Sequence, residues 1–509
     1  MNHVVNSTLA ISRPMGVAHE LGAEELDATS VFSKTVVLTG ERDVLARPNG
    51  RWCFINCLRL LSRVVGNLQV VIPDNVPELK ADLDALLPTI WTQGKVQQLS
   101  TDLCGWGSAA AVLNVGTQVR SDLRWTSILA NGWIARCTSG STSLPSGCEQ
   151  DNPLSCMFAA SLGVTEIFKR VYGVPNENAP PMEDAAFSLF ELSSNFSGLG
   201  PQLPPSIGIP RTLVLGAGAI GNGIVLLSSQ LPLTGKMLVM DKQNFGDENY
   251  GTCVLLDSVA WLGQPKAVQL GSWLKERSGL NVSGFKSTIE DALGNNSLDF
   301  KDIDLVINGL DDIDARKAVQ MLWPNLMVDG AINSAGAAVI THSMRHREFA
   351  CLRCAFDSPK TDHITVQSET TGLAQASLRG DQNRQISDAD IAAALEAARP
   401  WLREQQRLGR TICSTMQAAQ AEGLGLKLAD GFMPSVPFVA TASAALVMAQ
   451  VVRNTLWPNE KFVHTFQLAS LFVGLQTQVR VKRPASLECE CTRHGRVIDR
   501  LLLARQSAN

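Results

Sequence analysis

The feature that most constrains this chain is a glycine-rich turn between an apolar strand and an apolar helix. Gly216, Gly218 and Gly221 give the spacing G-x-G-x-x-G within RTLVLGAGAIGNGIVLLSSQL. Such a turn lets backbone N–H groups and a helix N-terminus meet a phosphate. Asp241 ends the next apolar run, about 20 residues later, where a carboxylate can accept hydrogen bonds from ribose hydroxyls. The pattern predicts a nucleotide-binding fold and, alone, allows both NAD and ATP.

Strand and helix patterns alternate along most of the 509 residues, which indicates an α/β fold with parallel sheets. The pattern is strong after Arg211 and fainter in the first 180 residues. In that first half, the strand KTVVLTG is followed by ERDVLARPNGRW in place of a glycine-rich turn. A phosphate would find no close backbone approach there. We therefore expect a nucleotide-binding fold that no longer binds nucleotide, with an unrelated α/β domain as the alternative.

Three charged residues behind the turn favour ATP over NAD. Lys266 stands in GQPKAVQL, Asp311 ends LVINGLD, and Arg316 follows in DDIDARKAV. An adenylating enzyme needs cations for the triphosphate and an acid for Mg²⁺, since the charge on the phosphates must be offset as pyrophosphate leaves. Each residue alone is an ordinary surface charge, but their order behind one glycine turn is specific. A dehydrogenase would leave this set without a role.

This order of motifs resembles the E1-like activating enzymes, which include the ThiF and MoeB sulfur-carrier activators and ubiquitin-type E1 enzymes. The resemblance covers most of 200–491 and implies adenylation of the C-terminal glycine of a ubiquitin-like protein. It implies that the three glycines and Lys266 bind phosphates, that Asp241 binds ribose, and that Asp311, with Asp312 beside it, positions Mg²⁺. In larger E1 enzymes an inactive half pairs with an active one. The two-half enzymes of bacterial ubiquitin-like (Bil) operons, linked to antiviral defence, are the most similar, and the fused E2–E1 relatives fit less well.

One motif departs from this family. After the ribose acid, members carry S-N-L-N-R-Q, whereas this chain has GDENYGTC. Asn249 matches the first Asn, but Thr252 replaces the Arg. The missing phosphate contact is therefore expected from elsewhere, and Arg13 in the N-terminal half is a candidate.

Two cysteine pairs predict a structural zinc site. Cys351 and Cys354 form C-x-x-C, and Cys489 and Cys491 form C-x-C, with His494 close behind as an alternative fourth ligand. Zinc favours four thiolate or imidazole ligands in short-spaced pairs. The metal would staple the C-terminal segment to the adenylation domain.

Cys413, in RTICSTMQ, is the candidate nucleophile. Taken alone it is most simply a small buried residue. In thioester-forming relatives, however, the nucleophile lies between the first zinc pair and a late apolar helix, and Cys413 is the one cysteine in that interval. Arg407 and Arg410 could favour the thiolate. Cys253, within the altered motif, ranks second.

We therefore predict two Rossmann-like ThiF/E1-type folds packed as an intrachain pseudo-dimer, active in the second half. The first predicted part is an inactive adenylation half (1–180), followed by a linker (181–210) and the active adenylation domain (211–360). A crossover segment with the catalytic cysteine (361–434) comes next, and the remainder of the adenylation domain (435–509) carries the second zinc pair.

The charge and cysteine content indicate which partners and which cellular compartment to expect. The net charge of -4 gives no sign of a nucleic-acid binder. We find no signal peptide and no run of about 18 apolar residues, so no membrane association is expected. Twelve cysteines without an export signal are typical of reduced thiols and metal ligands, which places the chain in the cytoplasm. The expected partners are a ubiquitin-like protein and an E2-like enzyme, and the chain could be monomeric.

Three other functions stay open. A sulfur-carrier activator would stop at the adenylate, and a non-catalytic partner subunit would bind ATP without turnover. A dehydrogenase would bind NAD.

Overall fold

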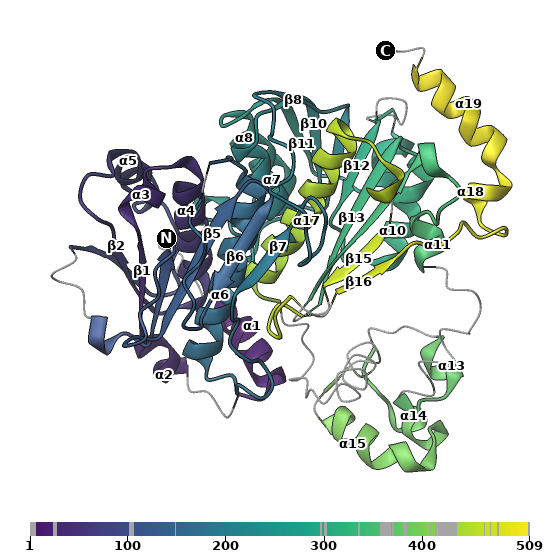
Figure 1. Cartoon of the computed structure of the whole chain (residues 1–509). Coiled ribbons are helices and arrows are strands. Elements are labelled where there is room, and N and C mark those ends of the chain that lie inside the picture. The colour runs from purple at the N-terminus through teal and green to yellow at the C-terminus, as the bar shows by residue number, and fades with distance from the viewer. Residues whose placement is uncertain are drawn as a thin grey trace.

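Two α/β halves, each built on a mainly parallel sheet, lie side by side in the computed structural model (Figure 1). The structure describes residues 7–23, 28–100, 106–147, 149–295, 298–299, 303–333, 336–356, 368, 371–379, 384–407, 409–410, 412, 415, 435–462, 464–468, 470–475 and 478–506.

The first half contains a seven-stranded sheet in the order β3-β2-β1-β4-β5-β6-β7. Strands β1 to β5 run parallel, and β6 and β7 add antiparallel. The strands are β1 (Thr35–Gly40), β2 (Asn67–Val71), β3 (Lys95–Leu99), β4 (Ala111–Val115), β5 (Trp125–Asn131), β6 (Ile134–Thr138) and β7 (Ala185–Ser188). The helices are α1 (Ser7–Glu20), α2 (Ala28–Ser33), α3 (Arg42–Leu45), α4 (Pro48–Val64), α5 (Pro77–Leu86) and α6 (Pro153–Tyr172).

The second half contains a nine-stranded sheet in the order β11-β10-β9-β12-β13-β14-β15-β16, with β8 paired to β10. Its strands are β8 (Ile207–Gly208), β9 (Thr212–Leu215), β10 (Leu233–Met240), β11 (Gly279–Phe285), β12 (Leu305–Asn308), β13 (Leu326–Ile332), β14 (Ala337–Ser343), β15 (Thr465–Leu468) and β16 (Gln478–Val481). Its main helices are α7 (Ala219–Gln230), α8 (Lys266–Lys275), α9 (Ile289–Gly294), α10 (Ile313–Val319), α11 (Leu352–Phe356), α17 (Pro437–Leu456), α18 (Glu490–Arg493) and α19 (Gly495–Gln506).

The two sheets share one topology. The parallel order β3-β2-β1-β4-β5 of the first half corresponds to β11-β10-β9-β12-β13 of the second, and antiparallel strands follow in both. The prediction of two related α/β halves is thus confirmed at the level of two parallel-rich sheets. The segment 181–210, expected to be partly a linker, differs from that expectation: it contributes β7 to the first sheet and β8 to the second.

Long apolar helices join the halves. Helix α6 begins after Asn152, whose side chain accepts a hydrogen bond from the Leu154 N–H, and ends at Gly173 with φ +67°. It packs against α17, where the Ser161 and Thr441 hydroxyls lie 3.0 Å apart. By length and composition α17 could cross a membrane, but 83% of its apolar window is buried inside the protein. We read α17 as a core helix of the interface between the halves.

A small helical unit lies apart from both sheets, at the lower right of Figure 1. It consists of α13 (Gln375–Leu378), α14 (Asp388–Ala393) and α15 (Arg399–Arg407). It has a core of its own, which includes Leu378, Ile391, Leu402 and Ile412. This unit falls within 361–434, the segment expected to carry the catalytic cysteine.

Candidate nucleotide site and metal centre

The glycine turn lies between β9 and α7, at the carboxyl end of the sheet. Gly216 has φ +86°, and a Cβ built on it would lie 2.9 Å from the Gly309 carbonyl carbon. A Cβ on Gly221 would lie 2.0 Å from the Gly216 carbonyl oxygen. A Cβ on Gly218 would meet nothing within 4 Å. Two glycines therefore close the turn, and the third leaves an open cradle at the N-terminus of α7.

Asp241 follows β10 and ties this turn to the neighbouring strand. Its carboxylate accepts hydrogen bonds from the Ala217 N–H at 2.6 Å and from the Gln243 N–H at 2.7 Å. The side chain is buried beside the turn.

Lys266 is the first residue of α8 and is also buried. Its Nζ donates to the Gln243 Oε1 at 2.8 Å. Because the Gln243 N–H donates to the Asp241 carboxylate, Gln243 connects Lys266 with Asp241. The buried ammonium has a neutral partner here, not a carboxylate, which leaves its charge available to a phosphate.

The end of β12 carries the acidic residues of the site. Asp312 caps α10 by accepting from the Ala315 N–H at 2.6 Å. Asp311 is exposed and makes no hydrogen bond or ion pair within the described part of the chain. Arg316 differs from the expectation of a phosphate-binding cation: it donates to the Asp329 Oδ2 at 2.9 Å and to the Leu310 carbonyl at 2.7 Å.

Two residues of this edge were missed by sequence reasoning. Asn308 ends β12 and donates to the Asp329 Oδ1 at 2.6 Å, and both side chains are fully buried. Burial raises the pKa of Asp329 to about 6, although the nearby Arg316 opposes the rise. The signal was present in LVINGLDD and LMVDGAI, where a polar residue ends or interrupts an apolar strand.

The altered motif lies next to Arg13. Asn249 is buried and accepts from the Gly246 N–H at 2.9 Å. Helix α1 packs on the short 3₁₀ helix η3 (Asp247–Asn249). Burial lowers the pKa of Arg13, and nearby Cys253 and Glu248 oppose this shift. The structure thus brings Arg13, an N-terminal residue, to the motif that lacks its arginine.

The residues present fit a nucleotide. The Gly218 cradle is open, and two polar atoms of the altered motif, the Asp247 Oδ1 and the Tyr250 hydroxyl, are buried without a hydrogen-bond partner among the described residues. Buried polar atoms are normally hydrogen-bonded, so these two are suited to a polar ligand. Burial, with Asp247 nearby, raises the pKa of Tyr250, so its hydroxyl stays protonated.

The same position in the first half is filled by Glu41, which directly follows β1. Its Oε1 accepts from the Thr117 and Gln118 N–H groups, each at 2.6 Å. A Cβ on Gly116 would lie 2.2 Å from this oxygen. The Glu41 carboxylate therefore binds backbone N–H groups at the carboxyl edge of the first sheet, which corresponds to the edge of the second sheet that carries the cradle. Its negative charge disfavours the binding of a phosphate there.

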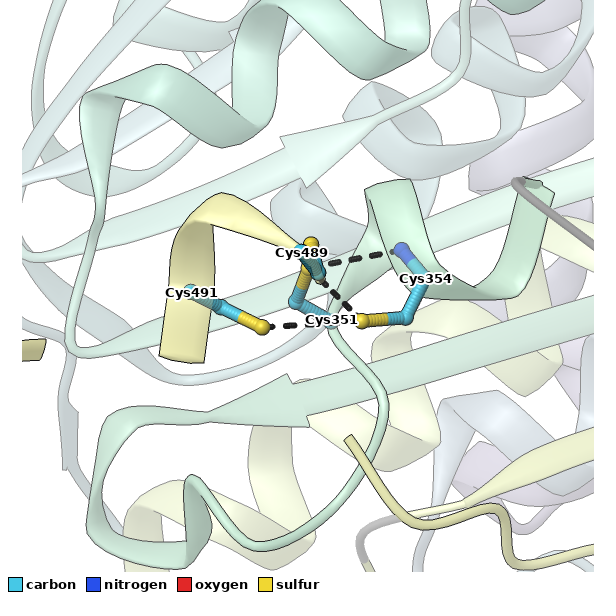
Figure 2. Close-up of side chains that lie close together, drawn as sticks. All are labelled: Cys351, Cys354, Cys489 and Cys491. Carbon is cyan, nitrogen blue, oxygen red and sulfur yellow. Dashed lines mark hydrogen bonds between the residues drawn. The ribbon is translucent and has the colours of Figure 1, made fainter. Parts of the chain in front are cut away.

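The four predicted cysteine ligands lie together (Figure 2). All their Sγ atoms are within 4.8 Å of one another, and the Sγ atoms of Cys354 and Cys491 are 3.5 Å apart. A tetrahedral metal with bonds of about 2.3 Å to sulfur separates its ligands by about 3.8 Å, so the cluster fits a thiolate-bound metal. Cys489 and Cys491 both belong to this cluster, and His494 does not.

Cys413, the predicted nucleophile, lies outside the described residues. Of the two arginines expected to favour its thiolate, Arg407 pairs with Glu404 at 2.6 Å, and Arg410 donates to the Gln405 Oε1 at 2.7 Å. Cys253, the second candidate, is buried. Burial raises its pKa, although Lys266 and Arg13 oppose the rise. That environment suits an inert thiol better than a nucleophile.

Together, the parallel sheet and the glycine turn form a nucleotide-binding α/β fold. The chain belongs to the ThiF family, whose profile matches residues 190–491. The BilD N-terminal domain matches residues 35–180. The prediction of an E1-like member related to the Bil operons is therefore confirmed. Members of the ThiF family are ATP-dependent adenylyltransferases.

Solved structures of MccB from E. coli are also similar. MccB with MccA-N7isoASN has 14% identity and a TM-score of 0.36, covering 55% of this chain and 66% of that chain. MccB with ATP has 15% identity and a TM-score of 0.34, with the same shares. This chain thus spans just under two thirds of the length of MccB. At this level of similarity, the substrate and partners of MccB are not assigned to this chain. No curated protein matches the chain.

Proposed function

We propose that this protein is an E1-like activating enzyme that uses Mg-ATP to adenylate the C-terminal glycine of a ubiquitin-like protein. The observation that supports this best is the open cradle at Gly218, together with Asp241 and Asp311, which follow the neighbouring strands β10 and β12, and Lys266, which begins α8. In this proposal the α7 N-terminus and Lys266 bind phosphates, and Asp241 binds the ribose. Mg²⁺ would offset charge on the phosphates.

Asp311 is the residue we assign to Mg²⁺. The carboxylates of Asp241, Asp312 and Asp329 all accept hydrogen bonds from protein groups. Asp311 is exposed and, within the described residues, has no such partner. It can therefore take a metal without breaking a contact that the fold requires.

Arg13 is our candidate for the cation that Thr252 cannot supply. It lies beside Cys253 and Glu248 of the altered motif, and its Nη1 is 3.4 Å from the Ser435 hydroxyl. We expect Arg13→Gln to raise the KM for ATP about tenfold, as loss of a charge-assisted phosphate contact would. Arg42→Gln, on α3 of the first half, is the control and should leave this KM unchanged.

The second step in the proposal is capture of the modifier on Cys413. The thiolate attacks the acyl-adenylate carbonyl, the C–S bond forms, and AMP leaves with the electrons of the C–O bond. The thioester then passes to the cysteine of an E2-like enzyme. We assign the pathway to bacterial ubiquitin-like conjugation in antiphage defence, in the cytoplasm, because of the BilD N-terminal match.

The remaining architecture has a place in this proposal. The first half acts as the inactive partner of an intrachain pseudo-dimer. Zinc on Cys351, Cys354, Cys489 and Cys491 staples the C-terminal segment. A sulfur-carrier activator without a thioester is the second candidate function, because Cys253 is buried and a thioester therefore depends on Cys413 alone.

One experiment tests both steps. A ubiquitin-like protein with a C-terminal glycine is incubated with the enzyme and Mg-ATP. Pyrophosphate exchange is measured, and gels are run with and without thiol reductant. We expect Asp311→Ala to lose exchange by at least about 100-fold. Cys413→Ala should keep exchange and lose a reductant-sensitive band. Exchange without any such band would favour the sulfur-carrier function, and no exchange in the wild type would refute adenylation.

A further inference from the structure

Arg63, on α4 of the first half, is fully buried against a loop of the second half. Its Nη1 donates to the carbonyls of Leu256 at 2.9 Å and Tyr250 at 3.3 Å. Its Nη2 donates to the Val254 carbonyl at 3.2 Å and to the Asp257 Oδ1 at 2.6 Å. A single side chain therefore fixes both ends of the loop 250–257.

Arg59, one turn earlier on α4, makes a second set of contacts to the same loop. Its Nη1 donates to the Asp257 Oδ2 at 2.7 Å and to the Val254 carbonyl at 3.3 Å. Asp257 thus receives one arginine on each carboxylate oxygen. Charge-assisted bonds of this kind are shorter and stronger than neutral ones.

Trp91 completes this clamp from the first half. Its ring stacks on Tyr250 with centroids 4.9 Å apart, and its backbone N–H donates to the Asp257 Oδ1 at 3.4 Å. The guanidinium of Arg63 lies 5.2 Å from the centre of the same ring. The loop is therefore held by charge, hydrogen bonds and stacking at once.

The loop 250–257 is connected to the phosphate cradle through Asn222 on α7. The Leu255 N–H donates to the Asn222 Oδ1 at 3.2 Å. The Nδ2 of the same side chain donates to the carbonyls of Gly218 at 2.9 Å and Ala217 at 3.0 Å. Both carbonyls belong to the glycine turn at the N-terminus of α7, where the phosphates bind in the proposed function. Asn222 is fully buried, so its amide has little freedom to turn away.

We propose that Arg59 and Arg63 are positioning residues of the adenylation site, acting through Asp257, the loop 250–257 and Asn222 to fix the glycine turn. This inference rests on the proposed function. It gives the first half a specific role, because α4 then holds the nucleotide-binding turn of the second half in shape. Energetic coupling between distant sites is carried by contiguous networks of packed and hydrogen-bonded side chains, and this network connects α4 to the glycine turn without a break.

The test uses Arg59→Gln in the full-length protein. Arg63 is fully buried, and replacing it carries a greater risk of unfolding the protein. Arg59→Lys is the conservative variant. It keeps a positive charge, and its Nζ can replace the Arg59 Nη1 as donor to Asp257 and the Val254 carbonyl. Arg51→Gln is the matched control: it changes an arginine of the same helix whose partner, Asp82, belongs to the first half at 4.0 Å.

We expect Arg59→Gln to raise the KM for ATP in pyrophosphate exchange about tenfold, with kcat changed less than about twofold. Arg59→Lys should recover most of the affinity, and Arg51→Gln should match the wild type. Hydrogen exchange should rise in 250–257 and also in 216–222, with the rest of the folded protein unchanged.

A folded Arg59→Gln with wild-type KM, or with faster exchange in 250–257 alone, would overturn the inference and leave the clamp a plain interface contact. If the wild type shows no pyrophosphate exchange, the proposed function fails, and hydrogen exchange at 216–222 still decides whether the clamp reaches the turn. Asn222→Ala provides the second variant. Hydrogen exchange should rise at 216–222 and at the Leu255 N–H, which loses its acceptor, with the rest of 250–257 still protected.

Discussion

At the scale of single residues, the three glycines of the turn have two roles: Gly216 and Gly221 allow the backbone to close, and Gly218 leaves the cradle open. Gly218 leaves open space, so Gly218→Ala should fold like the wild type and lose ATP, because its new methyl group occupies the cradle. Loss of at least about tenfold in ATP affinity is expected, measured by calorimetric titration. Unchanged ATP affinity in Gly218→Ala would contradict the assignment of the cradle.

Gly221→Ala should fail differently. Alanine normally favours a helix over glycine by about 1 kcal/mol. Here its Cβ would lie 2.0 Å from the Gly216 carbonyl oxygen, and both atoms are attached directly to the backbone. We expect a net loss of about 1–3 kcal/mol in the free energy of unfolding, measured by denaturant titration. A gain in stability would show that the turn can open without cost.

Glu41 is the residue that fills the edge of the first half. Glu41→Ala removes the acceptor for the Thr117 and Gln118 N–H groups, and we expect a loss of about 1.5–3 kcal/mol in the free energy of unfolding. Glu41→Gln, which keeps one acceptor oxygen, should lose less. ATP stoichiometry, measured by titration, should stay at one per chain in both variants.

His464 gives a stability that depends on pH. Burial, reinforced by the nearby Arg480 and Arg453, lowers its pKa to about 3. The unfolded chain binds this proton below pH of about 6.5, and the folded chain does not until much lower pH. The free energy of unfolding should therefore fall by up to about 1.4 kcal/mol per unit as the pH drops below 6.5. His464→Gln should show a shallower slope between pH 7.5 and 5 in denaturant titrations.

At the scale of elements, the cysteine cluster joins α11 to α18. We expect one zinc per chain, released by a chelator with a fall in Tm, because the metal bridges segments that are distant in sequence. A coloured zinc indicator measures the release. Cys354→Ser should lose the zinc, and Cys253→Ser, which changes a thiol outside the cluster, should keep it.

Elements also show what the sequence can and cannot predict. The turn around Gly216 and the cysteine pairs were visible because each is a local pattern with a local physical reason. The Asn308–Asp329–Arg316 network was not, because it depends on which strands are neighbours. The pairing of Arg63 with Asp257, 194 residues apart, could not be predicted at all, since no local spacing encodes it.

At the scale of the whole molecule, the two halves bury long apolar helices against each other. Helices α6 and α17 pack against each other across the chain, and Gly223 of α7 lies against α17, where a Cβ would be 2.6 Å from the Ala444 side chain. We expect a single chain in solution at micromolar concentration, measured by light scattering. A dimer that depends on concentration would show that another surface mediates self-association.

The contact between α6 and α17 also has a consequence for synthesis on the ribosome. Ser161 and Thr441 touch across 280 residues of chain. At about 5–20 residues per second, roughly half a minute passes before α17 is made, and until then the side of α6 that faces α17 lacks its partner. The helix that then emerges has the length and hydropathy of a membrane segment. We therefore expect the first half to hold an apolar surface open for α17 throughout the synthesis of the second half.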